Sequence, residues 1–181
     1  MMITVSPCFH WVGYHISTGL LQEGYEVIGI DGMDDLLSDH LYMYVGRNSN
    51  FQHFYNHTDK ENHLQIGEEE RKVSIDDYLI VILSGEGSSL VRRIEIPELY
   101  GEWMDIHSLN LQSPDELYEW VIKNDAVYIT DFLKVMIPLI IEEKAQTSTV
   151  IFDQEKSDED RKRNVEAVWK SHMVSLSLGI I

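Results

Sequence analysis

Basic residues are scarce in this chain of 181 residues, since 14 lysines and arginines stand against 31 aspartates and glutamates. The formal net charge of −17 disfavours nucleic acid as a partner, because a phosphate backbone would be repelled. The single cysteine, Cys8, has no partner for an internal disulfide. No apolar run is long enough to span a bilayer, and no charged-then-apolar leader segment is visible. These absences predict a soluble cytoplasmic protein that binds neither nucleic acid nor membrane.

Hydrophobic residues make up 44% of the chain, which is enough to bury one sizeable core. No repeat or low-complexity tract divides the sequence. We therefore expect one domain over residues 1–181.

The first 35 residues carry the clearest pattern. Apolar runs of strand length cover residues 1–6 and 25–31, and between them apolar residues recur at helical spacing until Gly24. This is the layout of a Rossmann βαβ unit, in which a glycine-rich turn faces a pyrophosphate and an acid after the second strand binds the ribose hydroxyls. Asp31 stands where that acid belongs. Gly13 matches the last glycine of the turn, and we expect it to let the helix pack closely on the strand.

The turn itself departs from the dinucleotide-binding pattern. It reads Ser6-Pro7-Cys8-Phe9-His10-Trp11-Val12-Gly13 where Thr-Gly-x-x-Gly-x-x-Gly is expected. Pro7 removes an N–H from the turn, and His10 places an imidazole where a Cβ would obstruct the pyrophosphate. The pattern therefore predicts the fold while weakening the prediction of a bound dinucleotide.

The remainder of the chain alternates between strand and helix signals. In its first half we expect a helix over 34–47, a strand over 51–55, a loop over 57–74, a strand over 78–83 buried on both faces of a parallel sheet, and an edge strand over 91–96. In its second half we expect a helix capped by Ser113 and ending near Asn124, a strand over 127–129, a helix over 131–143 whose last turns Pro138 bends or interrupts, a strand over 149–152, a helix capped by Ser157, and a last strand over 174–181. The sequence thus predicts an α/β, Rossmann-like domain with a mostly parallel sheet and helices on both faces.

Two separated blocks resemble the extended short-chain dehydrogenases, the NAD-dependent nucleotide-sugar epimerases and dehydratases. The first block runs from Ile3 to about Lys60 and includes Glu23-Gly24-Tyr25-Glu26-Val27-Ile28-Gly29-Ile30-Asp31. The second runs from about Arg93 to Phe152. It contains Ile96-Pro97-Glu98-Leu99-Tyr100-Gly101-Glu102-Trp103, similar to the family's Tyr-Gly-Pro-Trp element, and Asp125-Ala126-Val127-Tyr128-Ile129-Thr130-Asp131, similar to its Asp-Phe-x-Tyr-Val-x-Asp element.

The resemblance breaks at the positions that contact ligands. The family's Tyr-x-x-x-Lys pair is missing, because no tyrosine of this chain is followed by lysine at the fourth position. Where the family has an acid near the adenine and two arginines near the sugar nucleotide, this chain has His57, Asn124 and Glu95. The resemblance therefore implies a fold whose chemistry has been lost, with no cofactor, or with NAD if any is bound.

Two groups of residues are candidates for ligand contact. Gly85, Gly87 and Ser88 follow a predicted central strand and could cradle a phosphate at the carboxyl edge of the sheet, or could form a plain turn. Tyr100 and Trp103 could stack on a sugar or belong to the core.

Two further patterns have a functional and a structural interpretation. His53 and His57, with His63 nearby, would form a metal pair on a helix, but a strand and a loop are predicted there. Cys8 would be reactive if the helix N-terminus lowered the pKa of its thiol, although a packed thiol is favoured because no general base can be named.

We therefore expect a catalytically inactive, epimerase-like protein with a binding, regulatory or structural role. Analogy with the family links that role to nucleotide-sugar or surface-polysaccharide metabolism. Its expected partners are a second copy of the chain or another protein, through exposed apolar surface such as residues 174–181, and a nucleotide sugar is a further candidate. The alternative is an NAD-dependent nucleotide-sugar enzyme or binder with an altered site, using Asp31, residues 85–88 and Tyr100.

Overall fold

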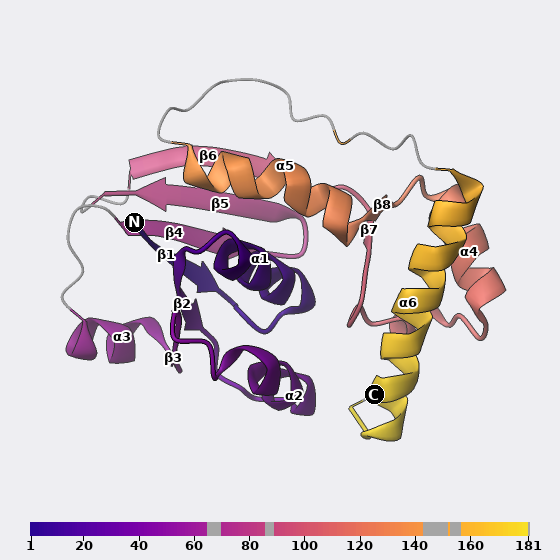
Figure 1. The fold of residues 1–181 in the computed structure, drawn as a ribbon, viewed down its shortest axis with the longest axis horizontal. Coiled ribbons are helices and arrows are strands. Elements are labelled where there is room, and N and C mark those ends of the chain that lie inside the picture. The colour runs from indigo at the N-terminus through magenta and orange to yellow at the C-terminus, as the bar shows by residue number, and fades with distance from the viewer. Residues whose placement is uncertain (65–69, 86–88, 143–151, 153–156, 181) are drawn as a thin grey trace. The chain divides into compact units, whose positions relative to one another are not determined.

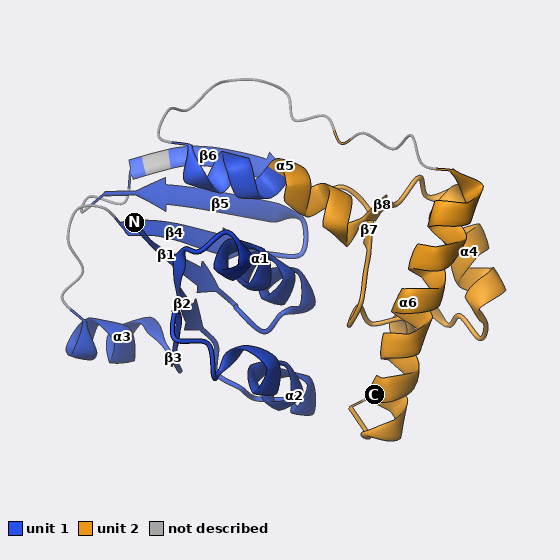
Figure 2. Cartoon of the chain, viewed as in Figure 1, with its two compact units in different colours: residues 1–96, 136–150 blue, residues 97–135, 151–181 orange. Residues whose placement is uncertain are grey.

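The computed structural model describes residues 1–64, 70–85, 89–142, 152 and 157–180 (Figure 1). The chain divides into two compact units (Figure 2). Unit 1 comprises Met1–Ile96 and Met136–Val150, and unit 2 comprises Pro97–Val135 and Ile151–Ile181. Folding of the two units as a single domain stays a prediction.

Unit 1 is built on a six-stranded sheet with the strand order β3-β2-β1-β4-β5-β6. The strands are β1 (Met2–Ser6), β2 (Glu26–Ile30), β3 (Phe51–Phe54), β4 (Glu70–Ile75), β5 (Leu79–Ser84) and β6 (Ser89–Glu95). β1 pairs in parallel with β2 and β4, and β2 pairs in parallel with β3. Only the β4–β5 and β5–β6 pairs among them are antiparallel, so β5 alone of these six strands is reversed. The predicted α/β class and mostly parallel sheet are confirmed.

Three helices connect the parallel strands of unit 1. Helix α1 (Trp11–Gln22) joins β1 to β2, α2 (Leu36–Val45) joins β2 to β3, and α3 (His57–His63) lies on the connection that returns from β3 to β4. Crossovers between parallel strands are right-handed, so helices on connections that run in opposite directions across a sheet cover opposite faces. The sheet therefore has α1 and α2 on one face and α3 on the other, as predicted.

The prediction of a loop over residues 57–74 is wrong for the described part of this range, which contains α3 and most of β4. Asn56 caps α3 by accepting a hydrogen bond from the backbone N–H of Asp59, at 2.8 Å. In β4 the buried positions Arg71, Val73 and Ile75 alternate with more exposed ones. The sequence does not show the matching alternation of apolar and polar residues, because one of the inward-facing residues of β4 is an arginine.

The strand predicted over 78–83 is present as β5, but two of its predicted features are wrong. It runs antiparallel to both neighbours, and its burial alternates, with Ile80 and Ile82 buried and Leu79, Val81 and Leu83 half-buried. An uninterrupted apolar run therefore did not mean burial on both faces. The predicted edge position of the next strand, β6, is confirmed.

Unit 2 contains a two-stranded sheet and helices. It consists of β7 (Leu99–Tyr100), the 3-10 helix η1 (His107–Leu109), α4 (Pro114–Lys123), β8 (Val127–Tyr128), the first part of α5 (Ile129–Ile141), and α6 (Asp158–Ser177). Strands β7 and β8 are parallel. Both predicted N-caps are confirmed, because Ser113 accepts from the N–H of Glu116 and Ser157 from that of Asp160.

Two predictions for the C-terminal half need correction. Pro138 does not interrupt α5, which continues to Ile141, and the predicted strand over 174–181 is instead the end of α6, which extends to Ser177. The strand predicted over 149–152 lies outside the described residues except for Phe152, which is not in a strand. Its ring stacks on that of Phe132, with centroids 5.2 Å apart.

Candidate functional site

The candidate site is the carboxyl edge of the parallel strands of unit 1, where α/β proteins usually bind ligands. Three segments meet there: the turn from β1 to α1, the residues after β2, and the end of β3. Cys8 N–H donates to the carbonyl of Ile30, and Asp31 N–H donates to that of Phe54, at 3.0 and 3.1 Å. The backbone thus joins all three segments.

The turn after β1 folds its side chains inward. Cys8 and Phe9 are 0% and 2% exposed. A Cβ built on Gly29 of β2 would come within 2.6 Å of the Cys8 sulfur, so the thiol lies directly against the sheet. Burial raises the pKa of the Cys8 thiol far above its usual range, and the nearby Asp31 carboxylate raises it further. This supports the packed thiol over the reactive one.

Asp31 lies at the predicted position and uses its carboxylate within the chain. Its Oδ2 accepts a hydrogen bond from Phe9 N–H at 2.9 Å, and its Oδ1 accepts from Met33 N–H at 3.0 Å. In a dinucleotide site the turn N–H groups face phosphate and the acid faces ribose. Here the acid and one of those N–H groups bind each other.

Phe9 fills the space between the turn and β3 with an aromatic ring. Its centroid lies 5.4 Å from that of His53, 6.0 Å from Tyr42 and 6.2 Å from Phe51. His53 Nε2 also lies 2.9 Å from the carbonyl oxygen of Asp31. The sequence signal for this packing was a pair of apolar residues, Cys8-Phe9, in a turn where small residues were expected.

Gly13 makes the close approach that was predicted for it, but to the turn rather than to the strand. A Cβ at this position would lie 2.0 Å from the carbonyl oxygen of Pro7. The first turn of α1 therefore presses on the backbone of the β1–α1 turn, and only glycine leaves room for the contact.

Gly85, the first residue of the predicted phosphate-binding turn, lies at the amino ends of the parallel strands and not at their carboxyl ends. Because β5 is antiparallel, its end lies beside the start of β4, and Gly85 N–H donates to the carbonyl of Glu70 at 3.3 Å. Gly85 is therefore separated from Asp31 by the length of the strands, and the predicted location at the carboxyl edge is wrong. Gly87 and Ser88 lie outside the described residues.

Tyr100 and Trp103 belong to unit 2. Tyr100 is 1% exposed and packs against Tyr128, with ring centroids 5.2 Å apart, and burial raises the pKa of its phenol. Trp103 is half-buried, and its backbone N–H donates to Ser171 Oγ at 3.1 Å. Tyr100 is thus a core residue of its unit, which supports the structural interpretation of this aromatic.

The three histidines near β3 are dispersed over a strand and a helix. His53 lies in β3, and His57 and His63 are the first and last residues of α3. Over the ranges that the structure describes, no group of three or more His, Cys, Asp or Glu side chains could hold a metal ion.

His10 is a further titratable residue at this site. The sequence pattern indicated that its imidazole obstructs the turn, but gave no sign of a shifted pKa. His10 is half-buried at the N-cap of α1, and its Nδ1 makes no hydrogen bond with any described group. Burial lowers the pKa of the imidazole, while Asp77 in the β4–β5 turn and Asp31 oppose that shift.

We expect stability to fall on acidification because of His10. The folded-state pKa lies below the ordinary value, so the unfolded chain binds the proton first, and stability is lost as pH falls through the ordinary histidine range towards the folded-state pKa. Urea unfolding at pH 7.5 and pH 5.5 should show a smaller loss in His10→Gln than in the unmodified chain. The exposed His57→Gln is the control. An equal loss in all three proteins would contradict the prediction.

Among the described helices, none is both long and apolar enough to cross a membrane. Comparisons with models of protein families, with curated proteins and with solved structures find no match. The resemblance to nucleotide-sugar epimerases and dehydratases therefore stays a prediction.

Proposed function

We propose that this chain is a non-catalytic, Rossmann-like protein that acts by binding other protein chains. The observation that carries the proposal is the filled turn after β1, in which Cys8 and Phe9 are buried and Phe9 N–H binds Asp31. A dinucleotide would have to displace both the ring and that hydrogen bond.

The sequence independently supports a non-catalytic role. Redox or epimerase chemistry of the short-chain dehydrogenase type needs a tyrosine activated by a lysine four positions later, and the chain has no such pair. By analogy alone, a protein of this kind would assist a nucleotide-sugar or surface-polysaccharide pathway. The alternative, a nucleotide-sugar binder, would have to use Asp31, already bound by its own chain, and Tyr100, which is buried.

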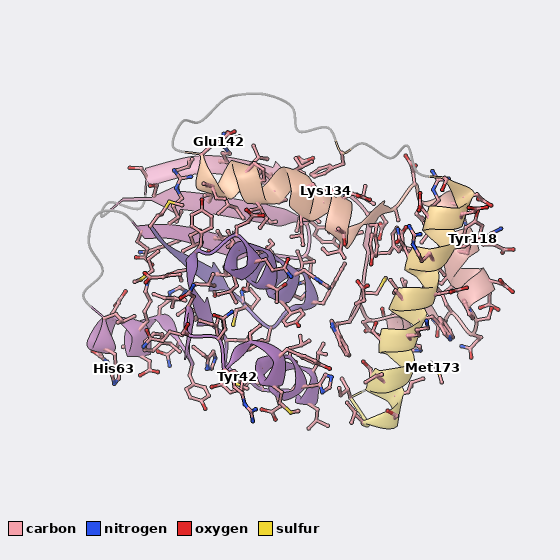
Figure 3. The ribbon with its side chains drawn as sticks, in the orientation of Figure 1. Tyr42, His63, Tyr118, Lys134, Glu142 and Met173 are labelled. Carbon is pink, nitrogen blue, oxygen red and sulfur yellow. The ribbon has the colours of Figure 1, made fainter. Side chains whose placement is uncertain are left out.

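The binding role is supported by the last turns of α6, where polarity is inverted. The buried side chains there are Ser171, His172 and Ser175. Four large apolar side chains are exposed there together with Ser177, and they are Met173, which is labelled in Figure 3, Val174, Leu176 and the C-cap residue Leu178. A helix end that buries polar groups and exposes aliphatic ones is typical of a surface covered by another chain.

A second copy is the partner that suits this surface of α6. Residues 171–181 contain no Asp, Glu, Lys or Arg, although the whole chain has a net charge of −17. Two copies can therefore meet here without bringing Asp, Glu, Lys or Arg side chains into contact, and the remaining repulsion is screened beyond about 8 Å at physiological salt.

The cofactor half of the proposal is tested with NAD and with Asp31→Ala. NAD should not raise the melting temperature of the unmodified protein. Asp31→Ala should lower the melting temperature without any ligand, because it leaves the buried Phe9 N–H unpaired, which costs about 1–3 kcal/mol. A rise in melting temperature with NAD that Asp31→Ala abolishes would overturn the proposal.

The self-association half is tested by sedimentation velocity. We expect the unmodified protein to be dimeric at tens of micromolar, on the order of the affinity of weak complexes. The double variant Leu176→Ser/Leu178→Ser should be monomeric, whereas Ile122→Ser, which alters an exposed apolar residue of α4, should remain dimeric. A strictly monomeric unmodified protein would refute self-association.

A further inference from the structure

Helix α2 carries an apolar stripe on each of two sides. Its inward residues Ser38, Leu41 and Val45 are buried in unit 1. Its outward residues Leu36, Met43 and Tyr44 are 56%, 71% and 57% exposed. Positions 36, 40, 43 and 44 follow the spacing i, i+4, i+7, i+8, so the exposed residues form one continuous stripe with His40 between them.

The exposed stripe is ordered by contacts along the helix. Tyr44 Oη lies 3.2 Å from His40 Nε2, and the two rings meet edge to face with centroids 5.2 Å apart. Tyr42, labelled in Figure 3, is partly exposed beside the stripe and packs edge-on against Phe9. A single exposed aliphatic residue would need no explanation, but three large apolar side chains aligned on one helix do.

Carboxylates surround the N-terminal end of this stripe. Asp34, Asp35 and Asp39 are all exposed. Asp35 Oδ1 also caps the helix by accepting from Ser38 N–H at 2.6 Å. The surface therefore combines an apolar stripe with an acidic end.

We propose that the outer face of α2 binds an amphipathic helix of another protein, whose apolar side packs on Leu36, Met43 and Tyr44 and whose lysines or arginines lie against Asp34 and Asp39. This inference rests on the proposed binding role and names the surface and the chemistry of one partner. Methionine adapts to different apolar surfaces, and charge complementarity both orients such a helix and accelerates its association with a protein of net charge −17.

A second copy of this chain does not suit the same surface. A two-fold interface brings the same patch of both copies together. If the two helices run parallel, the three aspartates of one copy face the three aspartates of the other. If they run antiparallel, the aspartates lie near the C-terminal end of the other stripe, where the exposed Arg47 offers one positive charge for three carboxylates. The charge-free end of α6 has no such conflict, so the two surfaces are suited to different partners.

The test uses designed helical peptides as probes. One peptide carries leucine at i, i+3, i+4 and i+7 with lysine elsewhere, the second has glutamate in place of each lysine, and the third has serine in place of each leucine. Fluorescence anisotropy at physiological salt should show binding of the leucine–lysine peptide alone. Equal binding of the leucine–glutamate peptide, or of the lysine–serine peptide, would overturn the inference.

Variants of the protein locate the binding. Leu36→Ser/Met43→Ser should weaken binding of the leucine–lysine peptide about tenfold, which corresponds to about 1.4 kcal/mol. Asp34→Asn/Asp39→Asn should weaken it several-fold and reduce its dependence on salt. Tyr78→Ser, which changes an exposed aromatic of the β4–β5 turn, should bind as the unmodified protein does.

Unchanged binding by Leu36→Ser/Met43→Ser would show general attraction to an acidic protein and would refute the α2 surface. The NAD titration is independent of this outcome. Binding of NAD would overturn the proposed non-catalytic role, whereas loss of the peptide result alone would overturn only the partner assigned to α2.

Discussion

Replacing Gly13 with alanine is expected to destabilise the protein by about 3 kcal/mol or more, which is at the upper end for overpacking by one methyl group. The new Cβ would lie 2.0 Å from the carbonyl oxygen of Pro7 and 3.1 Å from its carbonyl carbon. Both atoms belong to the backbone, so neither can move aside as a flexible side chain would. The β1–α1 turn or the start of α1 must therefore shift, which disturbs the burial of Phe9.

The matched control is Gly24→Ala, at the end of α1. Gly24 has a positive φ of 86°, and a Cβ there would meet nothing within 4 Å. The expected loss is only the cost of a left-handed conformation, about 1–2 kcal/mol. Chemical denaturation of both variants separates the steric from the conformational effect. Equal losses at the two glycines would contradict the close approach at Gly13.

Lys60→Met is expected to destabilise the protein by about 3 kcal/mol, the lower end for a broken buried ion pair. The variant leaves the Glu70 carboxylate with a more distant cation, Lys72, whose Nζ lies 4.0 Å from Glu70 Oε2. Lys60 Nζ binds Glu70 Oε1, and the two side chains are 6% and 11% exposed. Thr4 Oγ1 donates to the same carboxylate oxygen at 2.5 Å. The pair joins α3 to β1 and β4.

Two further variants test the reason for that loss. Lys60→Met/Glu70→Gln should recover part of the stability, since glutamine carries no charge and still accepts from Thr4. Lys134→Met removes the cation of the ion pair between Lys134 and Asp131, in which the lysine is 71% exposed and the aspartate 15% exposed. Because the lysine charge is solvated, the variant should change stability by about 0–1 kcal/mol. A double variant less stable than Lys60→Met would show that the buried charge is not the cause.

The signals that predicted structure correctly are all local. The βαβ opening was visible because apolar runs and helical spacing stand next to each other along residues 1–31. The helix starts at Ser113 and Ser157 were predictable because an N-cap involves only residues within one turn of each other. Asp31 and Gly13 were placed at the correct edge of the sheet for the same reason.

The errors share a different cause. The direction of β5 depends on which strand it pairs with, and an apolar run contains no information about direction. That reversal moved Gly85 away from the candidate site. Helix α3 and strand β4 were missed because Lys60 and Arg71 point inward, where polar residues are not expected.

The sequence by itself determined the α/β class, the acidic character and the position of the turn that holds Gly13 and Asp31. Only the tertiary structure decided what that turn does. The ring of Phe9 is seen to fill the turn because residues of α2 and β3 surround it. The Asp31 carboxylate is seen to bind its own chain because the Phe9 N–H, 22 positions away in the sequence, donates to it. Helix and strand propensities depend on residues that are neighbours in the sequence. Burial and hydrogen-bond partners depend on residues that are far apart in the sequence and meet only in the folded protein.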